Sequence, residues 1–284
     1  MNTNLVIIDG SYYMYRSYYA SLQQNFRSPD GFPTGMLKFM TNMLHSVMQE
    51  FSCPIIIVLD SKAKNFRHEL YSEYKAHRDP TPDDLMKQYK PMCNIMQALG
   101  LILIKKKGWE ADDLIGTIAK RASESGAKTV ILTGDKDLKQ FVNKHVVLYD
   151  SLREKYTDLK SMLEEDGLHP KQVPAYLALC GDKADNIPGV SGIGHKTACK
   201  LLLEYKTLKG IYANLDKLPK GQQKKFREHK KDLKLSYSLT KCNVDVPLGF
   251  DVLTVLKSKK RYKIDRQELK KLFRQFNMKF MWMK

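Results

Sequence analysis

Short apolar runs alternate with longer segments of helical periodicity through the first half of the chain. The runs lie at 4–8, 54–59, 100–104, 128–133 and 145–149 and are rich in Val and Ile. Runs of this length and composition are typical of strands buried on both faces of a parallel sheet. Apolar residues recur at helical spacing at 36–48 and 114–122, between the runs. The pattern therefore predicts an α/β fold with a mostly parallel sheet.

One connection, at about 61–98, is too long for a single crossover helix. Pro80 and Pro82 interrupt it, so two helical pieces are expected. Spacings of four, four and three would place four residues of the first piece on one helical face: Arg67, Tyr71, Lys75 and Arg78. A cationic face with an aromatic ring suits phosphates and unstacked bases. A solvated basic helix would have the same spacing.

The second half of the chain has a mostly helical pattern. Helices are predicted at 171–180 and 195–205, on either side of the turn IPGVSGIG, and near 269–276. The change of pattern divides the chain into an α/β core at 1–168, which carries the 61–98 insertion, and a helical region at 169–284.

Carboxylates follow three of the apolar runs. Asp9 ends the first, Asp60 the second, and Asp135 and Asp137 follow the run at 128–133. Parallel strands bring their carboxyl ends to one edge of a sheet, where α/β proteins bind ligands. Two further clusters supply Glu110, Asp112, Asp113, Asp182 and Asp185. Each cluster alone could cap a helix or form a turn.

The nine acids together favour a metal centre. Carboxylates packed side by side repel one another unless cations lie between them. Mg²⁺ prefers oxygen ligands, and two ions are usual for phosphoryl displacement. The five cysteines form no CxxC pair, so neither a zinc site nor a disulfide framework is indicated.

Charge points to the partner. The chain has a formal net charge of +17, which favours a polyanion. The glycine-rich turn adds a candidate anion site, because Gly189, Gly192 and Gly194 lie directly before a predicted helix, followed by Lys196 and Thr197. The spacing differs from a Walker loop and is similar to a helix-hairpin-helix, which grips duplex phosphates without reading sequence. A plain glycine-rich connector is the alternative.

These motifs together resemble the 5′-nuclease (flap endonuclease) family, with the closest likeness to the N-terminal nuclease domain of bacterial DNA polymerase I and its free-standing and phage relatives. The matching stretches are IIDGSYYMYRSYYA, PTGM, FRHELYSEYKAHR, TPDDL, EADDLIGT, TGDKDLKQFV, GDKADNIPGVSGIGHKTA and LFRQFNMKFMW. The resemblance implies a PIN-like core, a helical arch at about 61–98 and a duplex-binding helix-hairpin-helix region.

The resemblance also implies roles for single residues. One ion would be held by Asp9, Asp60, Glu110, Asp112 and Asp113, the other by Asp137, Asp182 and Asp185, with Asp135 near both. Lys75, Arg78 and Arg16 would contact the scissile phosphate, and Tyr12 and Tyr74 would stack or pack nearby. The expected cofactor is Mg²⁺, with Mn²⁺ as a substitute and K⁺ at the hairpin.

The expected function is a structure-specific, metal-dependent 5′-nuclease that acts as a flap endonuclease and a 5′-3′ exonuclease in replication and repair. Its partners would be branched or 5′-ended DNA, such as 5′ flaps and nicks, and the pattern leaves RNA primers open. No run is long enough to span a bilayer and no signal pattern is visible, so a cytoplasmic protein is expected. A monomer is the default expectation. The rivals are a catalytically silent DNA-binding protein, which should lack acids, and a small-molecule phosphatase, which needs no hairpin.

Overall fold

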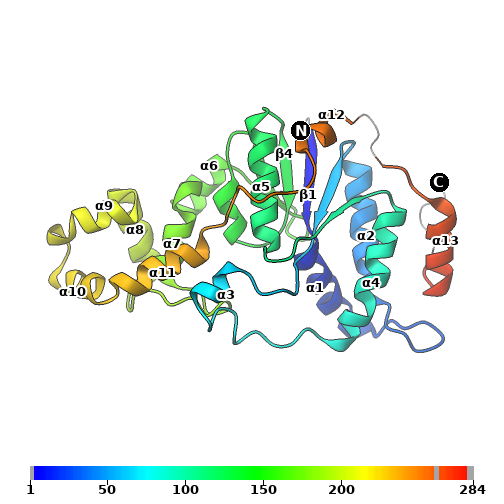
Figure 1. The fold of residues 1–284 in the computed structure, drawn as a ribbon, viewed down its shortest axis with the longest axis horizontal. Coiled ribbons are helices and arrows are strands. Elements are labelled where there is room, and N and C mark those ends of the chain that lie inside the picture. The colour runs from blue at the N-terminus through cyan, green and yellow to red at the C-terminus, as the bar shows by residue number, and fades with distance from the viewer. Residues whose placement is uncertain (1–2, 259–261, 280–284) are drawn as a thin grey trace.

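A six-stranded sheet forms the centre of the computed structural model, which describes residues 3–258 and 262–279 (Figure 1). The strands are β1 (Leu5–Asp9), β2 (Ile55–Val58), β3 (Ile102–Ile104), β4 (Thr129–Leu132), β5 (Val146–Asp150) and β6 (Lys155–Thr157). Their order is β3-β2-β1-β4-β5-β6, and every neighbouring pair is parallel except β5 and β6. The five predicted strands are confirmed. The short antiparallel β6 was not predicted.

The central strands β1, β2 and β4 are buried on both faces, because nearly all of their residues are apolar. Val6 and Ile8 of β1 contact one core, and Leu5 and Ile7 contact the other. The first core includes α1 (Gly10–Ser21), α2 (Gly35–Glu50), α4 (Asp83–Ala98) and α13 (Arg266–Gln275). The second includes α5 (Ala111–Glu124), α7 (Val173–Cys180) and α12 (Val252–Lys257). In Figure 1, α2 and α5 flank the sheet from opposite sides.

A helical lobe extends from the sheet (Figure 1). It has its own apolar core and contains α8 (His195–Tyr205), α9 (Leu208–Ala213), α10 (Lys220–Glu228) and α11 (Lys230–Thr240). Short helices α3 (Phe66–Leu70) and α6 (Leu159–Ser161) complete the fold of the described residues. None of the helices in 3–258 and 262–279 is long and apolar enough to cross a membrane. The last matching stretch, 272–282, ends outside these described residues.

The 61–98 connection corrects one prediction. Its second piece is the helix α4, but its first piece is helical only over α3, because Tyr71 turns to extended backbone. The chain then runs as turns through residue 78, and Lys75 takes a left-handed conformation with φ of +58°. The Lys75 amide donates to the Asp185 carbonyl at 3.0 Å. The predicted helical face of Arg67, Tyr71, Lys75 and Arg78 is therefore wrong.

Candidate active site and metal centre

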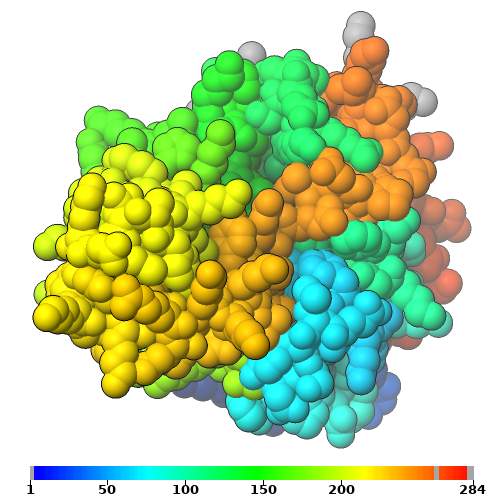
Figure 2. Space-filling view, turned by 60° about the vertical axis from the view of Figure 1, so that its left-hand side comes forward, coloured from blue at the N-terminus to red at the C-terminus, as the bar shows by residue number. Residues whose placement is uncertain are grey.

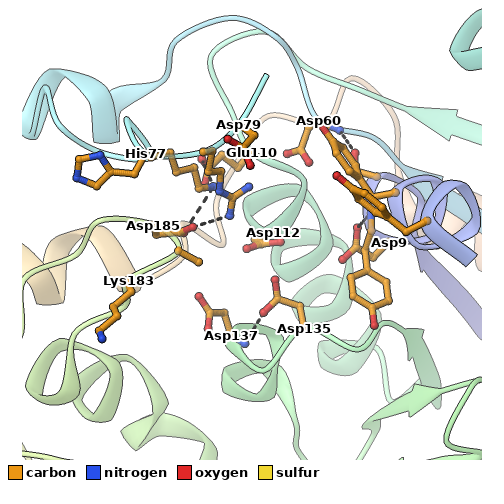
Figure 3. Close-up of a pocket in the computed structure, with 17 residues that line it drawn as sticks. Asp9, Asp60, His77, Asp79, Glu110, Asp112, Asp135, Asp137, Lys183 and Asp185 are labelled. Atoms are coloured by element: carbon orange, nitrogen blue, oxygen red, sulfur yellow. Dashed lines mark hydrogen bonds and ion pairs between the residues drawn. The ribbon is translucent and has the colours of Figure 1, made fainter. Parts of the chain in front are cut away.

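An open cavity of about 490 Å³ lies at the carboxyl edge of the sheet. Seven of the nine predicted acids line it: Asp9, Asp60, Glu110, Asp112, Asp135, Asp137 and Asp185. Lys75 and Arg78 of the 61–98 connection line it as well. Figure 3 shows Asp112, Asp135, Asp137 and Asp185 facing one another, with Asp9 and Asp60 along the opposite side. The strand ends, the start of α5 and the loop before the hairpin thus converge on one space.

Local hydrogen bonds orient the acids at the strand ends. Asp9 ends β1 and caps α1, where its Oδ1 accepts from the Tyr12 amide at 3.1 Å. Its Oδ2 accepts from the Thr133 hydroxyl at 3.1 Å. Asp60 reaches across to α5, where its Oδ1 accepts from the Ala111 amide at 2.8 Å. Each side chain therefore has a set direction before any ligand binds.

Burial and mutual repulsion make this cluster resist ionisation. Burial, helped by the Asp60 charge, raises the pKa of Asp9 to about 7. Burial and the Asp135 charge likewise raise the pKa of Asp137 to about 7. Burial and the same Asp135 charge raise the pKa of Asp112 well above its ordinary value. At neutral pH this group of acids needs added positive charge to be fully ionised.

The donor set fits divalent cations. It consists of hard carboxylate oxygens, and the buried Asp137 Oδ1 has no hydrogen-bond partner. In the observed rotamers, no group of three or more His, Cys, Asp or Glu side chains within 3–258 and 262–279 is arranged to hold a metal ion. Metal binding at this site would therefore require some of the acids to adopt other side-chain rotamers.

Two cations face the acids inside the cavity. Lys75 Nζ lies 2.7 Å from Glu110 Oε1 and 3.7 Å from Asp185 Oδ2, and Arg78 also pairs with Asp185. Burial opposes the ionisation of Glu110, but Lys75 and Arg67 outweigh it and lower the Glu110 pKa to about 2. The cavity therefore presents positive groups to an anion beside acids that suit a metal.

Two predicted site residues, Asp113 and Arg67, lie outside the lining of the cavity. Asp113 is fully buried and accepts a hydrogen bond from each terminal nitrogen of Arg67, at 2.8 Å each. In this structure Asp113 and Arg67 satisfy each other inside the protein, so it gives no support to the predictions of Asp113 as a metal ligand and of Arg67 as a DNA contact. Tyr71 is partly buried against Tyr74, Ile187 and Leu239.

Asp182 and Arg16 lie next to the cavity without lining it. Asp182 pairs with Lys136 at 2.6 Å, and its charge contributes to the raised pKa of Asp137. Arg16 lies 3.6 Å from Asp150 and contacts the Tyr12 hydroxyl. Their assigned roles stay predictions.

Sequence reasoning missed an aromatic wall. Tyr15 and Tyr19 line the cavity together with Tyr12, and 39% of Tyr15 and 56% of Tyr19 are exposed. The three tyrosines are spaced three and four residues apart on α1, so helical periodicity could have revealed their shared face. His77, Asp79 and Lys183 also line the cavity and were not predicted, although His77 and Lys183 lie within the matching stretches.

The glycine-rich turn connects directly to this cavity. Asp182 and Ile187 exchange backbone hydrogen bonds at 2.9 and 2.8 Å, which closes the loop that carries Asp185. Gly189 then lies against the end of α7, Gly192 has φ of +72°, and Gly194 precedes the first turn of α8. Residues 182–197 therefore connect the acids directly to the amino end of α8.

Family comparison agrees with this architecture. Residues 4–169 match the family described as 5'-3' exonuclease, N-terminal resolvase-like domain, and residues 168–263 match 5'-3' exonuclease, C-terminal SAM fold. The chain belongs to the 5'-3' exonuclease family. The family predicted from the motifs is thus confirmed.

The match covers nearly all of some relatives and only a small part of others. The 5'-3' exonuclease of Aquifex aeolicus is 34% identical over 283 residues, which are 97% of this chain and 96% of that protein. DNA polymerase I of Pseudomonas aeruginosa is 40% identical over 257 residues. The match covers 87% of this chain but only 28% of the polymerase, so the chain spans under a third of that relative.

The solved structure of zinc-bound T5 5'-exonuclease has a TM-score of 0.69 at 20% identity, over 95% of this chain and 97% of that one. This likeness, with the two family matches, confirms the predicted fold class of a PIN-like core and a helical region.

Proposed function

We propose that this chain is a divalent-metal-dependent nuclease that hydrolyses DNA phosphodiesters at 5′ ends, both as a 5′-3′ exonuclease and as a 5′-flap endonuclease in replication and repair. The observation that carries the proposal is the convergence of eight carboxylates on one open cavity that Lys75 and Arg78 also line. A nuclease needs both features, because metal ligands and phosphate-binding cations serve the same reaction.

The acids would hold two Mg²⁺ ions, for which Mn²⁺ can substitute. Asp9, Asp60, Glu110 and Asp112 would hold one, Asp137, Asp182 and Asp185 the other, and Asp135 would serve both. When bound, such ions lower the pKa of a water molecule and neutralise charge on the phosphate. A K⁺ ion at the 187–197 hairpin is a further expectation of the proposal.

Side chains of the cavity bind and orient the DNA. Lys75 and Arg78 hold the scissile phosphate, and they stabilise the negative charge that builds up there before the 3′ oxygen leaves. Arg16, beside the wall at Tyr12, assists them. The exposed rings of Tyr15 and Tyr19 provide surfaces for unstacked bases, which suits a single-stranded 5′ end.

The hairpin supplies the grip on duplex DNA. The backbone amides around Gly192 and Gly194, at the start of α8, form a phosphate site with Lys196 and Thr197. Phosphate contacts position a duplex without reading its sequence. The preferred substrates are therefore branched or nicked DNA bound by a monomer, and specificity comes from structure.

A cleavage assay on 5′-flap, nicked and blunt DNA, with Mg²⁺ or with a chelator, tests the function. Asp135→Asn should lower cleavage at least about 100-fold and leave DNA binding intact, because the carboxylate between the two metal positions is lost. A variant that cleaves at the wild-type rate would overturn the proposal. A silent binding protein would bind the flap and never cut it, and a phosphatase would prefer p-nitrophenyl phosphate to DNA.

A further inference from the structure

Three segments that are distant in sequence meet beside the cavity. They are the base of the 61–98 connection at α3, the start of α5, and the end of α11 with the chain that follows it. Figure 2 shows the cyan segment near residue 70 packed against the orange segment near residue 240. Arg67 makes hydrogen bonds to both of the other segments.

The Arg67 guanidinium has a fixed orientation. The side chain is only 1% exposed, and both terminal nitrogens bond Asp113 at 2.8 Å. Nε donates to the Leu239 carbonyl at 2.9 Å. Asp113 in turn accepts from the Asn243 amide at 2.8 Å. Because the planar guanidinium is hydrogen-bonded both through Nε and through its two terminal nitrogens, it cannot rotate. The fold therefore also fixes where its other contacts lie.

The two carboxylate oxygens of Glu110 have different partners, and Arg67 is a partner of only one of them. Arg67 Nη1 lies 3.2 Å from Glu110 Oε2, and the Tyr74 hydroxyl donates to that oxygen at 3.2 Å. The other oxygen, Oε1, lies 2.7 Å from Lys75 Nζ in the cavity. The Glu110 amide also donates to Asp113, at 3.3 Å. Only one oxygen of Glu110 is thus left to face a cation in the cavity.

We propose that Arg67 is a positioning residue, which holds Glu110 so that its Oε1 faces the candidate metal centre, and that Asp113 holds Arg67 for this purpose. The inference rests on the proposed nuclease function, in which Glu110 is a metal ligand. Groups that hydrogen-bond a metal ligand orient it and tune its affinity for the ion.

A buried ion pair with a purely structural role makes a different prediction. Replacing both charges together is often tolerated, whereas removing one partner leaves a buried charge uncompensated. The double variant Arg67→Met with Asp113→Asn removes both charges, and the amide oxygen introduced at position 113 can still accept the Asn243 amide. A structural pair would lose nothing in this variant except some stability.

The experiment measures Mn²⁺ binding by electron paramagnetic resonance on the full chain, together with flap cleavage, flap-DNA binding in chelator and thermal unfolding. The folded double variant should bind Mn²⁺ about 10- to 100-fold more weakly, and kcat should fall by a similar factor. Its KM for flap DNA and its DNA affinity in chelator should stay within about twofold of wild type, since the hairpin is untouched.

Two further variants complete the design. Arg67→Lys keeps the buried positive charge but loses the two parallel hydrogen bonds to Asp113. It should therefore weaken Mn²⁺ binding, though less than the double variant does. Arg27→Met removes a surface pair with Asp84, at 2.9 Å, and should behave as wild type. A folded double variant with wild-type Mn²⁺ affinity would overturn the inference. If the double variant does not fold, wild-type Mn²⁺ affinity in Arg67→Lys would overturn it instead.

The two proposals can fail separately. If the wild-type chain cleaves no DNA, the nuclease function fails, while Mn²⁺ affinity still decides the role of Arg67. If the wild-type chain cleaves flaps and the folded variants match it in Mn²⁺ affinity and kcat, only the positioning role fails.

Discussion

At Asp137, the properties that suit a metal oppose the stability of the metal-free fold. The carboxyl oxygen Oδ1 is buried without a hydrogen-bond partner, and its neighbours include Asp135, Asp182 and Asp185. Burial and these charges raise the Asp137 pKa to about 7 from 3.8. The folded chain therefore binds this proton more tightly than the unfolded chain does.

The sign of the pH dependence follows from linkage. A raised pKa in the folded state contributes stability below the unfolded pKa, near 4, and this contribution is lost as pH rises through about 7. Asp137→Asn cannot ionise, so it should stabilise the metal-free protein at pH 8 by on the order of 2 kcal/mol. The gain should shrink as pH falls from 7 towards 4.

Urea unfolding in chelator at pH 5 and pH 8 measures this difference. The matched control is Asp216→Asn, because the Asp216 side chain is 94% exposed and away from the cluster. An equal gain at both pH values would contradict the proposed origin in repulsion and burial. With Mg²⁺ present, the sign should reverse, because the wild-type carboxylate gains a partner.

At the scale of the element, the 187–197 hairpin depends on close backbone approach at one glycine and not at another. A Cβ at Gly189 would lie 2.5–2.6 Å from backbone atoms of Cys180 and Gly181, at the end of α7. A Cβ at Gly194 would meet nothing within 4 Å, and its φ of −92° suits any residue. The two glycines therefore make a matched pair within one motif.

Gly189→Ala should push the hairpin away from α7 and cost about 1–3 kcal/mol of stability, as overpacking does. It should also weaken duplex binding, because the amides at the start of α8 would shift. Gly194→Ala should preserve stability and should weaken duplex binding less than Gly189→Ala does, because its added Cβ displaces no protein atom. Thermal unfolding and fluorescence anisotropy with a short duplex measure them, and equal behaviour of the two variants would refute this account of the hairpin.

At the scale of the whole molecule, charge is divided by location. The formal net charge is +17, yet eight acids are gathered in one cavity. The remaining surface is accordingly more basic than the total suggests. A basic surface around an acidic cavity suits a polyanion that lies across the molecule and offers one phosphate to the acids and any metal they hold.

DNA binding should therefore fall steeply with salt. If the duplex contacts involve about six phosphates, log Kd should change with log salt concentration with a slope near 5, so affinity should drop roughly 1,000-fold between 50 and 200 mM salt. The Asp135→Asn variant in chelator allows the titration without cleavage. A slope near zero would argue against a polyanion and for a small substrate.

Several features of this protein could be predicted from the sequence because they depend on local patterns. Apolar runs form strands wherever they can be buried, so all five predicted strands are present. Asp9 and Asp60 are attached to the ends of such strands, and the parallel sheet brings those ends together. The hairpin glycines likewise sit at fixed distances from the helix they precede.

Tertiary structure alone decided which charges face the cavity and which face each other. Arg67 bonds the Leu239 carbonyl, 172 residues away, and this contact withdraws Arg67 and Asp113 from the site. Lys75 reaches the acids through a left-handed turn, where helical spacing predicted a shared face. Side-chain direction in an irregular segment depends on distant partners, because no repeating backbone geometry sets it. Helices and strands have a repeating backbone geometry. For this reason the sequence alone was enough to place the acids at the ends of the strands.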